Sequence, residues 1–211
     1  MSATQIVQIA SISTALAASG GIATLSLFDV PLLSSQPASR SLPLTRWLFS
    51  RGSHIFPSAA IVSSGGFAYL AYAALPPTVR ALSTLLRSAT RGGPVSYYLA
   101  AAALSISIAP WTQFVMIPTN FALIRKNEEM GGKRSAATEA TNRSVEDSIN
   151  SKDDVSQWTD LSGPQARTSE ESTEEDDREV KAWLETFGKL NIARAVLIGS
   201  GGIVGLIGAL G

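Results

Sequence analysis

Four long apolar stretches, separated by polar segments, dominate the pattern of residues along the chain. They cover residues 6–28, 54–75, 95–117 and 190–210. Crossing about 30 Å of hydrocarbon takes roughly 20 apolar residues at the rise of an α-helix, so each stretch is long enough to span a membrane. The pattern therefore predicts four transmembrane helices, with both termini on the same side.

Small residues are frequent in the first, second and fourth stretches, and the fourth contains Gly201-Gly202-Ile203-Val204-Gly205, a GxxxG pattern. Small side chains let neighbouring helices approach closely. A dinucleotide-binding loop is not indicated, because residues 199–204 break the GxGxxG spacing and follow no strand. We therefore expect an all-α fold, a membrane-embedded four-helix bundle.

Between the third and fourth stretches the composition changes to Ser, Thr, Asp and Glu, with an acidic run at residues 170–177. Such a composition is typical of disorder. The predicted organisation is a membrane domain with helices 1–3 at residues 1–127, a disordered acidic insert at 128–180, and helix 4 at 181–211. The insert is either an interaction segment or a solvated spacer, and the spacer is the simpler interpretation.

Basic residues occur on both sides of the predicted spans. Those of the first loop, together with Arg125, Lys126, Lys181 and Lys189, favour the side of the acidic insert as cytosolic. The termini are then lumenal, and we expect an integral protein of an endomembrane. The sequon at residues 142–144 tests this orientation, because it can be glycosylated only if the insert is lumenal.

Charge and cysteine content exclude several classes of function. Lysine plus arginine equals aspartate plus glutamate, at 17 each, so no basic patch for a nucleic-acid partner is indicated. The absence of cysteine excludes disulfides, iron–sulfur clusters, thiolate-ligated haem and a cysteine nucleophile. A single histidine argues against a non-haem iron site, which uses two histidines and a carboxylate, and no metal is predicted.

Arg194 is the one charged residue inside a predicted span. Asn191 lies three residues before it, so both project from one face of the last helix, and Trp183 extends that face by further turns. Polar groups at membrane depth are costly and call for a partner or a function. The alternative is an arginine that reaches the headgroups with its stem in lipid.

The third stretch ends in Pro118, Thr119 and Asn120, with Pro110 and Trp111 deeper in the span. Pro118 removes a backbone donor, and the side chains of Thr119 and Asn120 offer hydrogen bonds at the same level. The pattern is consistent with a small polar pocket. It is equally consistent with prolines that only bend and terminate a helix.

His54 is the sole histidine, and the sequence places it where the chain enters the second span. Its side chain titrates near neutral pH by default, which makes it the natural candidate for a general base. A solvated interfacial histidine without a catalytic role is the alternative.

These residues carry a resemblance to a known family. They are the first span running into residues 26–32, Trp47 with Gly52 and Pro57, residues 110–112 with 116–120, and Trp183 with Leu190, Asn191 and Arg194. In order and spacing the chain resembles the four-span fungal anthrone oxygenases, also called noranthrone monooxygenases, of aromatic polyketide pathways. The resemblance covers all four spans, and only the acidic insert falls outside it.

The resemblance implies a membrane-bound monooxygenase of secondary metabolism that converts an anthrone to an anthraquinone. No cofactor is expected, and O₂ is the co-substrate. His54 would remove the C10 proton, while Arg194, Asn191 and Asn120 would hydrogen-bond the C9 oxygen. The remaining expected contacts to the planar polyketide substrate come from Trp111, Trp183 and Thr119.

Two further classes of function compete with this one. A non-enzymatic membrane interaction or scaffold protein would use the same polar residues to fix the helices and the acidic insert to recruit a partner. A transporter is less well supported, because no carboxylate lies inside a span. The expected partners of an enzyme are its substrate, the lipid bilayer and other enzymes of the pathway.

Overall fold

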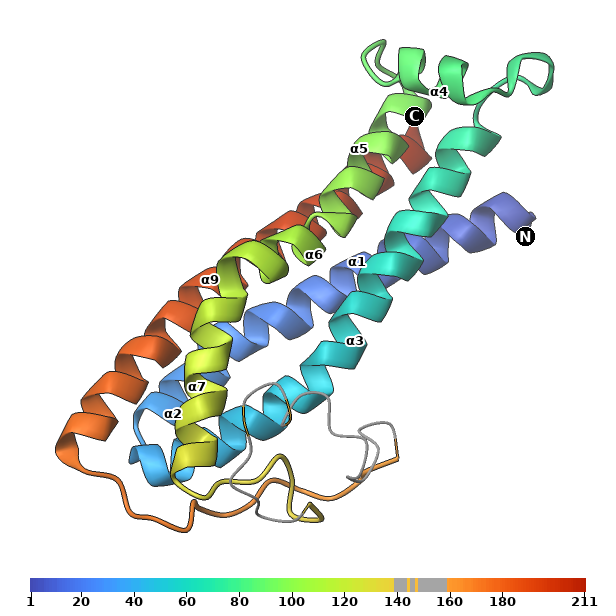
Figure 1. The fold of residues 1–211 in the computed structure, drawn as a ribbon. Helices are drawn as coiled ribbons and strands as arrows, with labels where there is room; N and C mark the ends of the chain where they lie inside the picture. Colours follow the sequence, from blue (N-terminus) through green and yellow to red (C-terminus); the bar gives the residue numbers. More distant parts are fainter. Residues whose placement is uncertain (139–143, 145–146, 148–158) are drawn as a thin grey trace. The chain divides into compact units, whose positions relative to one another are not determined.

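The computed structural model describes residues 1–138, 144, 147 and 159–211, and in these residues the chain is all helical (Figure 1). Four helical stretches are long and apolar enough to cross a membrane, and they cover Ala3–Ser34, Ala38–Ala73, Pro94–Glu129 and Glu174–Leu210. The predicted all-α class with four spans is therefore confirmed, and it fits an integral membrane protein.

The long stretches are built from regular helices joined by short irregular turns. The main helices are α1 (Ala3–Thr24), α3 (Ala38–Ala73), α5 (Pro94–Ile106), α7 (Ile117–Glu129) and α9 (Glu174–Leu210). The short ones are α2 (Val30–Ser34), α4 (Leu82–Ser88), α6 (Ile108–Trp111) and the 3₁₀ turn η2 (Pro77–Val79). Two π-helical turns, η1 (Leu25–Asp29) and η3 (Thr112–Met116), interrupt the first and third spans.

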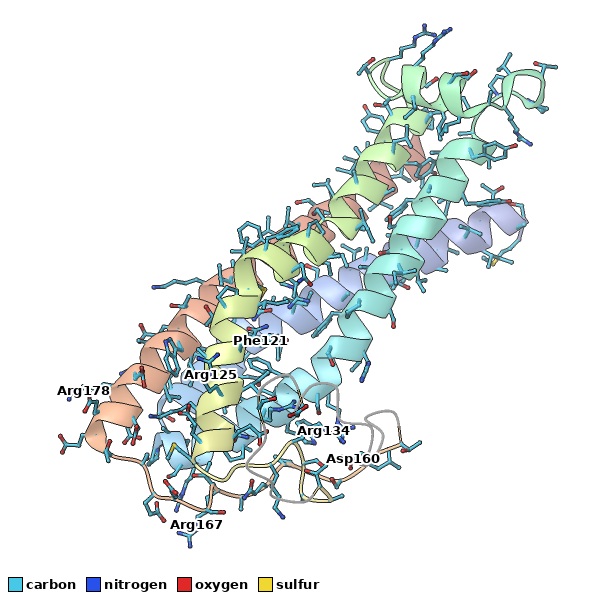
Figure 2. The ribbon with its side chains drawn as sticks, viewed as in Figure 1. Phe121, Arg125, Arg134, Asp160, Arg167 and Arg178 are labelled. Atoms are coloured by element: carbon cyan, nitrogen blue, oxygen red, sulfur yellow. The ribbon has the colours of Figure 1, made fainter. Side chains whose placement is uncertain are left out.

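The chain forms two compact units, and each span contributes to both. The first unit contains Met1–Ala23, Phe56–Gln113 and Ile192–Gly211; the second contains Thr24–Ile55 and Phe114–Asn191. The charged side chains labelled in Figure 2, Arg125, Arg134, Asp160, Arg167 and Arg178, all belong to the second unit. Long-range polar contacts therefore concentrate there, whereas the first unit is mainly apolar.

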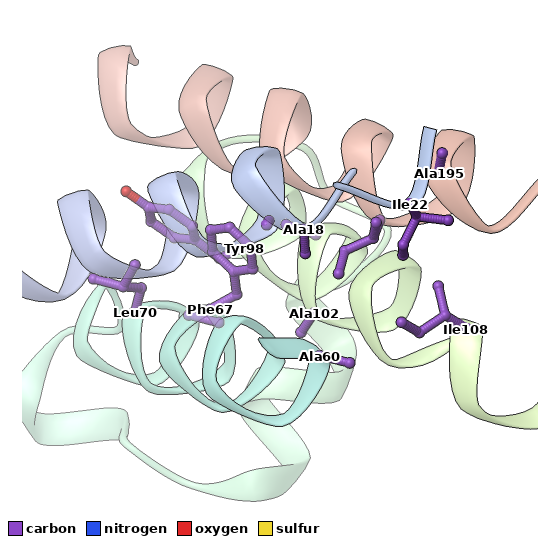
Figure 3. Close-up of a cluster of buried hydrophobic side chains, with 13 residues drawn as sticks. Ala18, Ile22, Ala60, Phe67, Leu70, Tyr98, Ala102, Ile108 and Ala195 are labelled. Carbon is purple, nitrogen blue, oxygen red and sulfur yellow. The ribbon is translucent and has the colours of Figure 1, made fainter. Parts of the chain in front are cut away.

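The core of the first unit is made mostly of small and aliphatic side chains, with two aromatic rings at one end (Figure 3). Phe67 and Tyr98 stack with their ring centroids 6.5 Å apart. The Tyr98 hydroxyl accepts a hydrogen bond from Nε2 of Gln8 at 2.7 Å. Buried alanines such as Ala15 and Ala101 keep the helix backbones close together.

The glycines of the GxxxG pattern lie at such close approaches. A Cβ atom at Gly201 would be 2.6 Å from Oγ of Ser105 and 3.0 Å from the carbonyl oxygen of Ala101. At Gly205 it would overlap the ring of Phe67. The interpretation of this pattern as a helix-packing motif is therefore confirmed.

Several helices extend beyond the predicted limits. The loop expected at residues 29–53 is replaced by α2 and by the first turns of α3, which begins at Ala38. The third span does not end at Pro118 but continues to Glu129. The hydrophobic pattern missed the extensions of α3 and α7 because they contain many polar residues, and hydropathy marks only the part of a helix that lies in lipid.

The last helix also begins earlier than expected, at Glu174, so the second half of the acidic run forms its first turn. Carboxylates are favourable there because they face the positive end of the helix dipole. Thr173 caps the helix reciprocally: its N–H donates to Oδ2 of Asp176 at 2.9 Å, and the N–H of Asp176 donates to its Oγ1 at 3.2 Å. The predicted disorder of the insert stays a prediction for residues 139–158, most of which lie outside the described residues. It is wrong for residues 128–138 and 159–180, which contain the end of α7 and the start of α9 and are held by hydrogen bonds to other parts of the chain.

Two adjacent glycines of α3 provide a matched test of this packing. A Cβ at Gly66 would overlap Oγ of Ser11 and lie 3.1 Å from its Cβ, whereas a Cβ at Gly65 would meet nothing within 4 Å. We expect Gly66→Ala to lower the free energy of unfolding by about 1–3 kcal/mol. Gly65→Ala should raise it by up to about 1 kcal/mol through helix propensity. Equal effects of the two variants on unfolding in mild detergent would contradict the packing described.

Candidate functional site

The predicted site residues are divided between the two units. Trp111 and Arg194 belong to the first unit, and His54, Thr119, Asn120, Trp183 and Asn191 belong to the second. Five of the seven lie on α9 or α7.

The buried stripe of α9 carries two polar residues. Its buried positions follow the 3–4 spacing of one helix face: Val180, Leu184, Phe187, Asn191, Arg194 and Ile198. Asn191 is 0 % exposed and Arg194 is 8 % exposed. The face that the sequence predicted for these two residues is therefore a buried one, and Trp183 lies half-buried beside it.

The guanidinium of Arg194 lies against an aromatic ring. Its central carbon is 5.7 Å from the centroid of Phe56, which comes from α3 in the same unit. A cation in apolar surroundings is costly, and the negative face of a ring offsets part of that cost. The burial rules out the alternative in which Arg194 reaches the headgroups, and it leaves a positive charge held beside a flat aromatic surface.

Asn191 is held by its own helix. Its Nδ2 donates to the carbonyl oxygen of Phe187 at 3.0 Å, one turn earlier. The ring of Phe187 in turn packs edge-on against Phe49 of α3, with centroids 5.1 Å apart. The amide is therefore fixed in orientation by a contact that a leucine in its place could not make.

Asn120 lies in the first turns of α7 and is half-buried, as is its neighbour Thr119. The Oδ1 atom of Asn120 is enclosed and has no hydrogen-bond partner among the described residues. An enclosed acceptor left unbonded costs about 1–3 kcal/mol, so the position is suited to a donor from a ligand or from water.

The prolines around Asn120 do not terminate the helix. Between Pro110 and Pro118 the chain passes through the π-helical turn η3, and Oγ1 of Thr112 donates to the carbonyl oxygen of Ile108 at 2.7 Å. A π-turn absorbs the missing proline donors while the helix continues, and such turns are frequent at functional sites. Trp111, which is half-buried, directly precedes this turn.

His54 lies well inside α3, not at its start as the sequence suggested, because the helix begins at Ala38. Its side chain is half-buried. One turn earlier, the guanidinium of Arg51 covers the ring of Trp47 at 5.1 Å. The histidine therefore belongs to a continuous helix, which holds its backbone more rigidly than a loop would.

The sequence missed a set of contacts made by residues 159–173, here called the return segment. Trp47 Nε1 and Arg51 both donate to the carbonyl oxygen of Ser162, at 3.0 and 3.1 Å. Farther along, the N–H of Thr168 donates to the carbonyl oxygen of Ser39 at 2.7 Å. The return segment thus lies along the polar first half of α3. Only Trp47 gave a sequence signal, as an indole whose N–H requires an acceptor.

The end of α7 turns the chain toward this segment. Gly131 has φ +70°, a conformation that favours glycine, and the N–H of Gly132 donates to the carbonyl oxygen of Asn127 at 2.7 Å. This is the Schellman arrangement that closes many helices. The N–H of Glu170 then bonds the carbonyl oxygen of Met130 at 3.1 Å, which joins the return segment to the helix end.

Asp160 is the buried carboxylate of the return segment. Its Oδ1 accepts from the N–H of Ser162 at 2.9 Å and from its hydroxyl at 2.6 Å. Burial alone would raise the pKa of Asp160, but hydrogen bonds from Ser135 and Ser162, together with the charge of Arg51, lower it below its usual value. The carboxylate is thus stabilised in its ionised form.

No group of three or more histidine, aspartate and glutamate side chains that could hold a metal ion occurs within the described ranges. The expected independence of a cofactor stays a prediction.

The four spans fit an integral membrane protein, and α9 carries buried polar residues within one of them. Comparison with protein families adds the assignment: the model of the anthrone oxygenase family matches residues 46–204, so the chain belongs to that family. The matched range contains all seven predicted site residues. No curated protein and no solved structure matches the chain.

The lowered pKa of Asp160 predicts how the return segment responds to acid. The folded pKa lies below the unfolded value of about 3.9, so the contribution to stability is present above about pH 4 and is lost as the pH falls further. We expect the protection of the amide hydrogens of residues 159–168, relative to their intrinsic exchange rates, to decrease below that pH. In Asp160→Asn this pH dependence should disappear, whereas Glu170→Gln, at an exposed carboxylate of the same segment, should retain it. Identical pH profiles in wild type and Asp160→Asn would contradict the assignment.

Proposed function

We propose that the protein is a cofactor-independent anthrone monooxygenase, which uses O₂ to convert an anthrone to an anthraquinone and water in aromatic polyketide biosynthesis. Membership of the anthrone oxygenase family supports the class of reaction. The observation that carries the chemistry is the buried cation of Arg194 beside an aromatic ring. A low-dielectric site with a fixed positive charge stabilises an aromatic oxyanion far better than water does.

The first step is loss of a proton from C10 of the anthrone. That carbon is flanked by two aryl rings conjugated with the C9 carbonyl, so the electron pair left behind is delocalised onto the C9 oxygen. His54 is the base that takes the proton. Arg194, Asn191 and Asn120 hydrogen-bond the C9 oxygen, where the negative charge collects.

In the second step the carbanion passes one electron to O₂, and the resulting radical and superoxide combine at C10. The peroxide takes up the proton held by the base to give a C10 hydroperoxide. Removal of the remaining C10 proton with cleavage of the O–O bond leaves the second carbonyl and releases hydroxide, which is protonated to water. One oxygen atom of O₂ thus enters the product and the other enters water, with no external reductant.

The tricyclic substrate is planar and apolar, and it partitions into the bilayer that surrounds the spans. Trp111 and Trp183 stack on its rings. Thr119 and the enclosed Oδ1 of Asn120 take polar substituents, since an amide oxygen without a partner is suited to a phenolic hydroxyl. The protein acts in an endomembrane, in association with other enzymes of the pathway.

The role of Arg194 is tested by substitution on one helix. Arg194→Gln removes the buried charge, and Arg178→Gln removes an exposed charge of the same helix α9. We expect the first variant to lose about 10²–10³-fold in kcat and the second to retain activity. Oxygen uptake by membranes supplied with an emodin-type anthrone measures this, after subtraction of uptake by empty membranes. Equal rates in Arg194→Gln and wild type would contradict the proposal.

His54→Gln tests the base separately. The variant retains a polar side chain but cannot accept a proton near neutral pH, so turnover should fall by about 10²–10⁴-fold. Unchanged turnover in His54→Gln would assign the base to another group and leave the role of Arg194 intact.

A further inference from the structure

The segment between α3 and α5 exposes both basic and apolar side chains. Residues 74–93 contain η2 and α4 and bridge the end of one membrane span to the start of the next within the first unit (Figure 1). They contain arginines at positions 80, 87 and 91 and no aspartate or glutamate. Leu82 and Leu86 are 71 % and 63 % exposed.

We propose that α4 is an interfacial helix that binds the phosphate headgroups of anionic phospholipids in the adjoining leaflet. Leu82 and Leu86 would enter the acyl boundary, and Arg87 and Arg91 would bind the lipid phosphates. This inference is independent of the proposed oxygenase activity.

The level of the membrane surface is marked by tyrosines at the helix ends next to this segment. Tyr69 and Tyr72 are exposed in the last turns of α3, and Tyr97 is exposed in the first turn of α5. Exposed tyrosines at the ends of apolar spans are typical of the headgroup region, where the ring is buried and the hydroxyl is hydrated. Because α4 lies in the connection between these two ends, it belongs to the same region.

The faces of α4 are arranged for such a position. Leu82, Leu85 and Leu86 share one side of the helix, and Leu85 packs against the core of the first unit. Arg87 lies opposite Leu85, and Ser83 lies between Arg87 and Leu86. The core contact of Leu85 fixes the rotation of the helix, so Arg87 faces away from the core and the exposed Leu82 and Leu86 lie along the edge between the two sides.

The three arginines have different roles. Arg80 donates to the carbonyl oxygens of Leu75 and Ala73, each at 3.1 Å, and lies over the ring of Tyr72. It closes the end of α3. The side chains of Arg87 and Arg91 are exposed and make no hydrogen bond or ion pair with a described residue. Two uncompensated cations on an interfacial segment attract an anionic surface, and guanidinium groups bind phosphate in a bidentate manner.

The position of α4 is testable because the chain has no cysteine, so one introduced cysteine can be labelled uniquely. Leu82→Cys and Ser83→Cys change exposed side chains that point about 100° apart around α4, one beside the leucines and one beside Arg87. With a bimane label on the full chain in phospholipid vesicles, we expect a doxyl lipid to quench the label at position 82. Aqueous iodide should quench the label at position 83. Iodide quenching at both positions, with no effect of the lipid quencher, overturns the proposal.

The lipid preference is tested on the full chain purified from vesicles of phosphatidylcholine with phosphatidylserine. Native mass spectrometry compares retained lipid in wild type, in Arg87→Gln with Arg91→Gln, and in Arg40→Gln, an exposed arginine of the second unit. We expect the double variant to lose roughly 25-fold in preference for phosphatidylserine and Arg40→Gln to match wild type. Equal preference in all three overturns the proposal. Added inorganic phosphate should not displace the lipid, and displacement would identify a soluble-anion site instead.

Discussion

The cost of placing polar groups in hydrocarbon is the constraint on which the rest of this structure depends. Backbone groups in the spans are satisfied within helices, and buried glycines and alanines let the helices approach closely. The buried stripe of α9 nevertheless carries Asn191 and Arg194. The guanidinium is placed against Phe56 and the amide is bonded to its own helix, so both are held in fixed orientations.

The same low dielectric gives these groups chemical value. Interactions of a fixed charge with an oxyanion are weak in water and strong where water is excluded. A reaction whose substrate is apolar, and whose transition state carries negative charge on one oxygen, is well matched to such surroundings. The chain belongs to the anthrone oxygenase family, and an anthrone is a substrate of this kind. Burial of the Arg194 guanidinium therefore costs stability, and the same burial strengthens its interaction with the oxyanion in the proposed catalysis.

The sequence was sufficient for features that depend on local pattern and insufficient for those that depend on tertiary contact. Hydropathy located the four spans, and spacing placed Asn191 and Arg194 on one face and Gly201 and Gly205 at a helix contact. The start of α3, the π-turn before Asn120 and the position of the return segment were not predictable. The start of α3 and the return segment are held by distant partners, as Ala38 is by Asp177 and Trp47 by Ser162, and no local pattern encodes such a pairing.

The fate of the two oxygen atoms tests the central claim most directly. Purified protein in detergent, treated with a chelator and supplied with an anthrone under ¹⁸O₂, is compared with protein-free micelles at short times. The account predicts that the protein accelerates the formation of anthraquinone carrying one ¹⁸O atom, with the second ¹⁸O recovered in water. Product formed no faster than in micelles alone, or formed only when metal or reductant is restored, would contradict it.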